Sequence, residues 1–178
     1  DPDNGERSLT RRGDPAVTAR VCDALENIDY VMSLGLISDE PARLAPVYEF
    51  AEMLANTGKP VLAWAYDVDN LRDIYDIALA VAGSPAALRE RPPFAFFSTF
   101  PSPLAHTDED LANSLWAVEH DIPLVYIGGG CAGTTGPITG AGQMVVYLAG
   151  ALSGLAIFQL KKRGAAVCLG AVPEAMDL

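Results

Sequence analysis

Glycine is concentrated in one segment of the sequence. Seven of the fifteen residues from Gly128 to Gly142 are glycine, between an apolar run that predicts a strand and one that predicts a helix. Glycine allows positive φ and close backbone approach to a ligand, and a helix that follows such a loop can bind phosphate at its N-terminus. The segment lacks G-K-[ST], so it is not a P-loop. The residues that we expect to bind a ligand or partner are Gly128, Gly129, Gly130, Gly133, Thr134, Thr135 and Gly136.

The same segment also fits a dinucleotide-binding pattern. Gly128, Gly130 and Gly133 have the G-x-G-x-x-G spacing, but this spacing arises easily in a glycine-rich run. The first acidic residue after the loop is Glu174, which lies beyond the usual distance of the residue that binds the ribose. Nucleotide binding and a turn that binds nothing therefore stay open as alternatives.

Two further residues could do acid–base or nucleophilic chemistry. His106 follows the end of a predicted strand and could act as a general acid or base or as a metal ligand; the alternative is a surface histidine beside a helix N-cap. Cys131 could be a nucleophile, although the sequence assigns it no partner. His120 is expected at a solvated helix end. The sequence contains no H-x-x-H, C-x-x-C or H-E-x-x-H motif, so we expect no zinc held by this chain.

Aromatic residues lie on or just after predicted strand ends. Tyr66, Phe97 and Phe100 are in this position, and Asp67 follows the first of them. Aromatic faces bind quaternary ammonium groups, and a carboxylate can pair with such a cation. Some of these aromatic residues must instead belong to the core, and Asp67 could simply cap the next helix.

The candidate residues are positioned by alternating helices and strands. Short apolar runs bounded by turn residues predict strands, and longer amphipathic runs predict helices. The predicted strands are residues 30–37, 61–66, 94–100, 122–127 and 166–170. The predicted helices are residues 14–26 with Asp14 as N-cap, 39–56, 70–82, a short turn at 85–89, 107–120 with Thr107 as N-cap, and a long helix that follows the 128–142 loop and ends near Lys162.

This alternation predicts an α/β fold with parallel strands joined by right-handed crossovers. About five βα units fit either a doubly wound open sheet or part of a (β/α)8 TIM barrel, and we expect one domain over residues 1–178. In both folds ligands bind at the carboxyl ends of the strands, which is where the candidate residues fall. Residues 144–158 carry no charge, but fifteen residues are fewer than the ~20 of a membrane span, so we expect a buried core helix.

Composition restricts the function further. The chain has 178 residues, 50% of them hydrophobic, and a net charge of −11, which excludes a disordered chain and argues against nucleic-acid or anionic-membrane partners. Its three cysteines suggest reduced thiols in a cytoplasmic protein. The polar N-terminus is no signal peptide, and without an initiator Met the chain is expected not to be a whole gene product.

Several segments resemble the trimethylamine:corrinoid methyltransferase family. The resemblance is strongest from residue 128 onward and covers nearly the whole chain. The matching segments are residues 5–7 (GER), 23–25 (DAL), 56–60 (NTGKP), 102–104 (SPL), 122–123 (IP), 136–142 (GPITGAG), 148–155 (LAGALSGL), 159–160 (QL), 164–167 (GAAV), 169–170 (LG) and 173–177 (PEAMD).

The resemblance implies an internal part of a TIM barrel that acts as a corrinoid-dependent methyltransferase. Such enzymes move a methyl group from trimethylamine or a quaternary amine, such as a betaine, to a Co(I) corrinoid. The resulting methylcobamide stays on a separate corrinoid protein, so this chain itself would bind no cofactor. In this hypothesis Gly128 to Gly136 approach the corrinoid, His106 is catalytic, and Tyr66, Asp67 and Phe100 bind the amine; these roles are inferred from position.

Two alternatives to this enzyme stay open. One is a non-catalytic truncated barrel that binds a corrinoid protein, and the other is an unrelated α/β enzyme that binds a nucleotide at the glycine loop. Pyrrolysine, which the founding members of the family carry, is absent from these 178 residues. Because an incomplete barrel exposes strand edges, we also expect the chain to form homo-oligomers or to aggregate.

Overall fold

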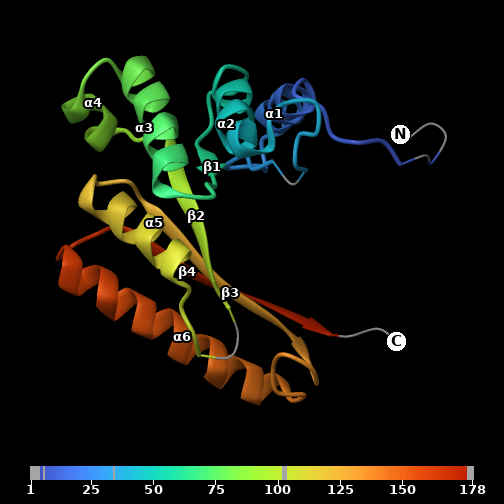
Figure 1. Ribbon diagram of the computed structural model, residues 1–178, viewed down its shortest axis with the longest axis vertical. Coiled ribbons are helices and arrows are strands. Elements are labelled where there is room, and N and C mark those ends of the chain that lie inside the picture. The colour runs from blue at the N-terminus through green and yellow to red at the C-terminus, as the bar shows by residue number, and fades with distance from the viewer. Residues whose placement is uncertain (1–4, 6, 34, 102–103, 176–178) are drawn as a thin grey trace. The chain divides into compact units, whose positions relative to one another are not determined.

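A computed structural model gives the structure of the chain (Figure 1) and describes residues 5, 7–33, 35–101 and 104–175. The chain forms two compact units, Asp1–Phe94 and Ala95–Leu178. The prediction of a single domain over residues 1–178 stays a prediction.

The first unit is mainly helical. Among its described residues there is one regular strand, β1. The first residue of this strand, Val61, donates a backbone hydrogen bond of 2.9 Å to Pro93 O. The elements of the unit are α1 (Asp14–Ala24), the 3-10 turn η1 (Ala42–Leu44), α2 (Ala45–Leu54), β1 (Val61–Ala63), α3 (Val68–Ala82) and α4 (Pro85–Glu90).

The prediction of a strand at residues 30–37 was wrong. Only Val31 forms a bridge, a parallel one with Val61. Further along, local contacts replace strand pairing: Ser33 Oγ donates to Gly35 O, and Ile37 N donates to a carboxylate oxygen of Glu49. A short apolar run therefore became a loop because side chains took up its backbone groups.

The start of α1 also differs from the prediction. Gly13, not Asp14, is the N-cap, and Asp14 is the first helical residue. Its carboxylate turns back and accepts a hydrogen bond of 2.7 Å from Arg11 N. The helix predicted at residues 39–56 is shorter in the structure. The 3-10 turn η1 precedes it, and α2 begins only at Ala45.

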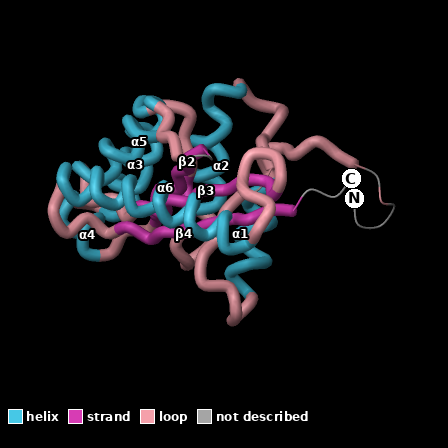
Figure 2. The backbone as a smooth tube through the Cα atoms, turned by 90° about the horizontal axis from the view of Figure 1, so that it is seen from below, coloured by secondary structure: helices cyan, strands magenta, loops and turns pink. Residues whose placement is uncertain are grey.

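The second unit is a parallel sheet with two crossover helices. Strand β3 pairs in parallel with β2 on one edge, from Phe96↔Leu124 to Pro101↔Gly129, and with β4 on the other, from Leu124↔Val167 to Ala132↔Ala175. Figure 2 shows β3 and β4 side by side in magenta. The elements are β2 (Phe94–Pro101), α5 (Asp108–Glu119), β3 (Leu124–Ala132), α6 (Gly140–Lys161) and β4 (Val167–Ala175).

This arrangement confirms the predicted α/β class with parallel strands, and it is consistent with part of a TIM-barrel-like fold. Thr107 is the N-cap of α5 as predicted, because its Oγ1 accepts a hydrogen bond of 3.2 Å from Asp110 N. In the first unit, β1 ends at Ala63 and is shorter than the strand predicted at 61–66. In the second unit, the last two strands end later than predicted. Strand β3 continues through Ala132, and β4 continues to Ala175.

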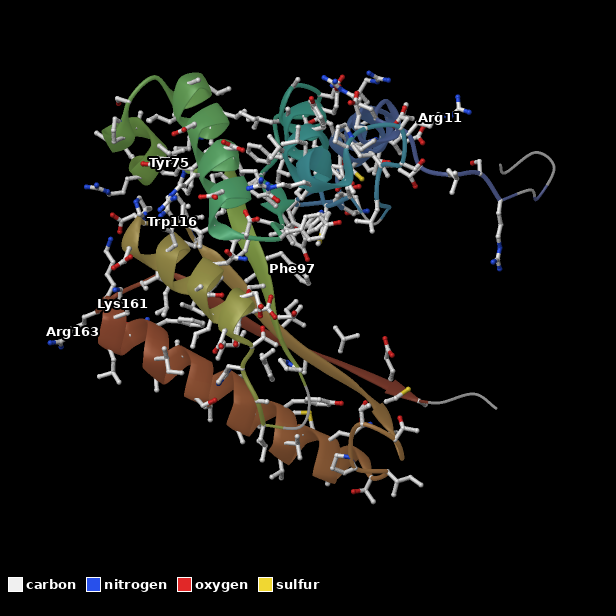
Figure 3. The ribbon with its side chains drawn as sticks, in the orientation of Figure 1. Arg11, Tyr75, Phe97, Trp116, Lys161 and Arg163 are labelled. Carbon is white, nitrogen blue, oxygen red and sulfur yellow. The ribbon has the colours of Figure 1, made fainter. Side chains whose placement is uncertain are left out.

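Both helices of the second unit cover the same face of the sheet. Figure 1 shows α5 and α6 side by side along β2, β3 and β4. Side chains alternate between the two faces: Phe96, Ser98 and Phe100 of β2 are buried toward the helices, whereas Phe97 and Thr99 are not. Figure 3 labels Phe97 on the side of β2 away from α5.

Helix α6 approaches the sheet closely because aromatic rings occupy space that glycines leave empty. A Cβ added at Gly150 of α6 would lie 2.4 Å from the Phe100 ring, and one added at Gly128 of β3 would lie 2.1 Å from the same ring. Tyr126 fills the corresponding space at Gly154, where an added Cβ would lie 2.5 Å away.

Only one stripe of α6 is buried. Among the described residues, α6 is the one helix long and apolar enough to cross a membrane, with a mean hydropathy of 1.6 over its best window, of which 33% is buried. The buried stripe packs on the sheet, so the prediction of a buried core helix at residues 144–158 holds for that stripe alone and was wrong for the rest of the helix. The opposite side exposes apolar side chains, among them Met144, Val145, Leu148 and Leu152.

Gly150→Ala is expected to destabilise the chain by about 1–3 kcal/mol, because the new methyl group overlaps the Phe100 ring. Gly140→Ala is the matched control: it lies in the same helix, has nothing within 4 Å of its added Cβ, and is expected to be neutral or slightly stabilising. Urea unfolding of both variants measures the difference. Equal stability of the two variants would contradict the close packing described here.

Candidate functional site

His106 joins three elements of the second unit through its two ring nitrogens. Nδ1 lies 2.6 Å from the Tyr126 hydroxyl of β3, and Nε2 lies 2.8 Å from Ser153 Oγ of α6. Ser153 Oγ in turn donates to Gly150 O over 2.8 Å. His106, which precedes the N-cap of α5, is therefore hydrogen-bonded to both the sheet and α6.

These contacts define which nitrogen of His106 carries the proton. Ser153 uses its only proton on Gly150 O, so Nε2–H must donate to the serine oxygen. In the neutral ring Nδ1 then accepts, and Tyr126 is its donor. Burial, together with the nearby Asp110 charge, raises the pKa of Tyr126 to about 12, so the phenol keeps the proton that it donates.

This network lies on the helix-covered side of the sheet. Tyr126 is fully buried and packs edge-on against Phe158 of α6, with ring centroids 4.9 Å apart. Phe100 is 2% exposed and its ring centroid lies 6.2 Å from that of His106. The structure thus brings these predicted site residues together, but in a packed layer. A catalytic role for His106 and an amine-binding role for Phe100 stay predictions, and this placement favours structural roles.

The glycine-rich segment is only partly a loop, which corrects the predicted boundary. Gly128, Gly129 and Gly130 belong to β3 and pair with β4. Two of these glycines have a packing reason, because an added Cβ would meet the Phe100 ring at Gly128 and the Val172 carbonyl oxygen, 3.2 Å away, at Gly129. The glycines do allow close approach, as the sequence predicted, but at these two positions they approach other residues of the protein and not a ligand.

The turn after β3 satisfies its own backbone. Gly133 N donates to Gly136 O, while Thr134 N and Gly136 N both donate to Cys131 O. Cys131 N donates to Thr135 Oγ1 over 2.9 Å. A phosphate-binding loop needs free N–H groups, and these four are already used, so the geometry does not favour the nucleotide alternative. Gly133, Thr134 and Thr135 are exposed.

The sheet face opposite α5 and α6 carries a second set of side chains, which we call the open face: Phe97, Thr99, Ile127, Cys131, Val172 and Glu174. Register places Cys131 beside Glu174 near the carboxyl ends of β3 and β4. The sequence pointed to each residue separately, but it could not align two strands and so gave Cys131 no neighbour.

A buried carboxylate organises the first unit. Glu49 of α2 is 1% exposed; its Oε1 accepts from Ile37 N and its Oε2 accepts from Trp64 Nε1, both over 3.0 Å. Burial raises the pKa of Glu49 from its ordinary 4.5, and the hydrogen bonds from Ile37 and Trp64 oppose that rise. Sequence reasoning missed Glu49 and Trp64; an acidic residue next to Phe50, in a helix rich in apolar residues, was the available signal.

Tyr66 and Asp67 follow β1 in the same unit. Tyr66 is 46% exposed and packs edge-to-face with Trp64, at a centroid distance of 4.9 Å and an interplanar angle of 86°. Asp67 is the N-cap of α3 and accepts from Asn70 N over 2.8 Å, so the capping alternative is confirmed. A role of either residue in binding the amine stays a prediction.

The described residues contain no group of three or more His, Cys, Asp and Glu side chains that could hold a metal ion. The three cysteines, which are all described, are free thiols: Cys22, Cys131 and Cys168. His120 lies at the end of α5, where its ring stacks on Trp116 with centroids 3.8 Å apart.

Glu49→Gln is expected to lower the free energy of unfolding by about 1–3 kcal/mol, because an amide cannot accept at both ends from Ile37 and Trp64. A raised pKa means that the folded state binds the proton more tightly. The wild type therefore loses stability, relative to this variant, as pH rises from 4.5 through the raised pKa.

Urea unfolding between pH 4 and 8 measures this difference. Glu90→Gln, at an exposed position of α4, is the control. Parallel pH profiles for the wild type and Glu49→Gln would contradict the assignment of this titration to Glu49.

Comparison with known proteins identifies the family. Residues 19–178 match the model of the trimethylamine methyltransferase (MTTB) family. The chain is 30% identical to trimethylamine methyltransferase MttB of Desulfitobacterium hafniense over 100% of its own length and 36% of that protein. It is 29% identical to MttB of Methanosarcina barkeri strain Fusaro, and 29% identical to MttB2 of Methanosarcina mazei, over 93% of its length and 34% of each relative.

The chain thus spans about a third of the length of these curated relatives. The matched region covers both units, including β1 with its aromatic pair and the β3 turn. The chain therefore belongs to the trimethylamine methyltransferase family.

Proposed function

We propose that this chain is part of an enzyme that removes a methyl group from trimethylamine or a betaine-type quaternary amine and delivers it to the corrinoid of a separate protein. The observation that carries the proposal is the family match over residues 19–178. The relatives are named for trimethylamine, and this chain shares 29–30% identity with them, so the choice of amine belongs to the proposal.

The exposed part of the β3 turn suits the approach of a flat macrocycle. Gly133 has φ of +81° and nothing closer than 3.9 Å to an added Cβ, so it presents bare backbone. Thr134 and Thr135 beside it are exposed. These residues would contact a corrinoid ring through van der Waals surface, because the N–H groups of Gly133 and Thr134 are used within the turn. A corrinoid with cobalt in the Co(I) state supplies a nucleophile toward the methyl carbon.

The open face supplies the other requirement, a surface that excludes water from the reacting methyl group. Phe97, Ile127 and Val172 give it apolar rows, and strand register keeps them on one side of the sheet. Exclusion of water and positioning are the main tasks of the protein when a cofactor provides the reactive atom. With the acidic chain, net charge −11, the electrostatic field also favours a cationic amine. We place the enzyme in the cytoplasm.

The direct test is methyl transfer by the full-length protein that carries this sequence. The protein is mixed with a reduced corrinoid protein and with trimethylamine, glycine betaine or methanol in turn, and corrinoid absorbance is followed. The proposal expects a spectral change with one of the two amines and none with methanol. Corrinoid-protein binding without transfer from either amine would instead support the non-catalytic binding module.

His106 variants separate catalysis from positioning. We expect His106→Gln to retain kcat within a few fold, because glutamine can still accept from Tyr126 and donate to Ser153. His106→Ala removes both bonds and is expected to lower the melting temperature. Loss of kcat by ~100-fold or more in both variants, at unchanged stability, would instead establish His106 as a general acid or base.

A further inference from the structure

Two aromatic rings stand at right angles just beyond β1. Trp64 and Tyr66 follow the last strand residue, Ala63, with ring centroids 4.9 Å apart and an interplanar angle of 86°. Neither ring is buried: Trp64 is partly exposed and Tyr66 is 46% exposed. Carboxyl ends of strands are where α/β proteins bind ligands, so this pair occupies a functional position.

A hydrogen bond to a buried carboxylate fixes the indole of Trp64. Its Nε1–H donates to Oε2 of Glu49, a carboxylate that is 1% exposed. The other oxygen of Glu49 accepts from Ile37 N, so the carboxylate cannot turn away without losing a second hydrogen bond. A surface aromatic ring fixed by a buried acceptor is pre-organised, which lowers the entropy lost on binding.

The acidic residues that follow the pair are ion-paired. Arg43 Nη2 lies 3.9 Å from Asp67 and 3.7 Å from Asp69, and Arg72 Nη1 lies 2.9 Å from Asp69. Two guanidinium groups therefore balance the two carboxylates, and the attraction for a cation comes from the rings. Perpendicular aromatic faces are the chemistry that recognises quaternary and tertiary ammonium groups.

We propose that Trp64 and Tyr66 form two walls of the ammonium-binding site, with Trp64 as a specificity-determining residue and Glu49 as the positioning residue that orients it. The inference rests on the proposed function, because it takes the substrate to be a methylated amine. A neutral molecule of the same shape would lose the attraction to the ring faces, so the site selects for charge as well as for methyl groups.

The test is binding of tetramethylammonium to the full-length protein, measured by titration calorimetry without the corrinoid protein. Trp64→Leu and Tyr66→Leu are each expected to weaken binding about tenfold, and Trp64→Phe, which keeps a ring face, by less. Neopentyl alcohol, a neutral probe of similar shape, should bind poorly to all variants. Trp116→Leu, which removes the tryptophan of α5, is the matched control and should bind as the wild type does.

Glu49→Gln tests the positioning role. It is expected to raise KM for the amine several-fold with kcat within a factor of about two, whereas a purely structural loss would lower the amount of active protein without changing KM. If Trp64→Leu does not fold, Trp64→Phe and Tyr66→Leu decide the question.

Wild-type affinity for tetramethylammonium in folded Trp64 and Tyr66 variants would overturn the inference, as would a wild type that does not bind this probe. Methyl transfer that is insensitive to these variants would overturn the inference and leave the proposed function standing. Amine binding that depends on Trp64 without any methyl transfer would do the reverse.

Discussion

The second unit depends on one constraint, the parallel pairing of β2, β3 and β4. Parallel neighbours cannot be joined by a tight turn, so each connection must be a crossover, and α5 and α6 both return over the same face. Because both helices lie on one face, alternate residues of each strand are either covered by the helices or left on the open face. Phe100 and Tyr126 fall on the covered face and pack, whereas Phe97 and Ile127 fall on the open face. Whether a strand residue of this unit packs under the helices or lies on the open face therefore follows from its position along the strand.

In the first unit, one buried carboxylate of α2 links two other segments of the chain. Glu49 accepts from the loop that ends at Ile37 and from Trp64 beyond β1, so the helix α2 fixes both segments at once. The aromatic pair is a local feature of the sequence, since its members are two residues apart. Its orientation is not local, because it comes from a helix earlier in the chain. The position of the aromatic pair thus comes from β1, whereas the rigidity of Trp64 comes from its hydrogen bond to α2.

Much of the fold could be predicted because helix and strand periods differ and the caps are local. Strand positions in the second unit, the Thr107 cap and the parallel class needed no tertiary information. The failures share a cause. Residues 30–37 have strand-like composition, but only Val31 of the described residues pairs with β1, while Gly35 O and Ile37 N bond to the side chains of Ser33 and Glu49. The glycine run signalled close approach without saying to what. His106 lay near the predicted edge, but only the folded chain reveals Tyr126 and Ser153 at its two nitrogens.

The packing of the Phe100 ring against two glycines has an evolutionary consequence. The ring occupies the space of two absent side chains, at Gly128 of β3 and Gly150 of α6, from two different elements. Either glycine can change to a larger residue only after Phe100 has become smaller. Substitutions there are expected to arise as coupled sets, and a relative with a side chain at either glycine position should carry a smaller residue than phenylalanine in the strand. Correlated substitutions at positions 100, 128 and 150 would then indicate how closely α6 packs on the sheet in each relative.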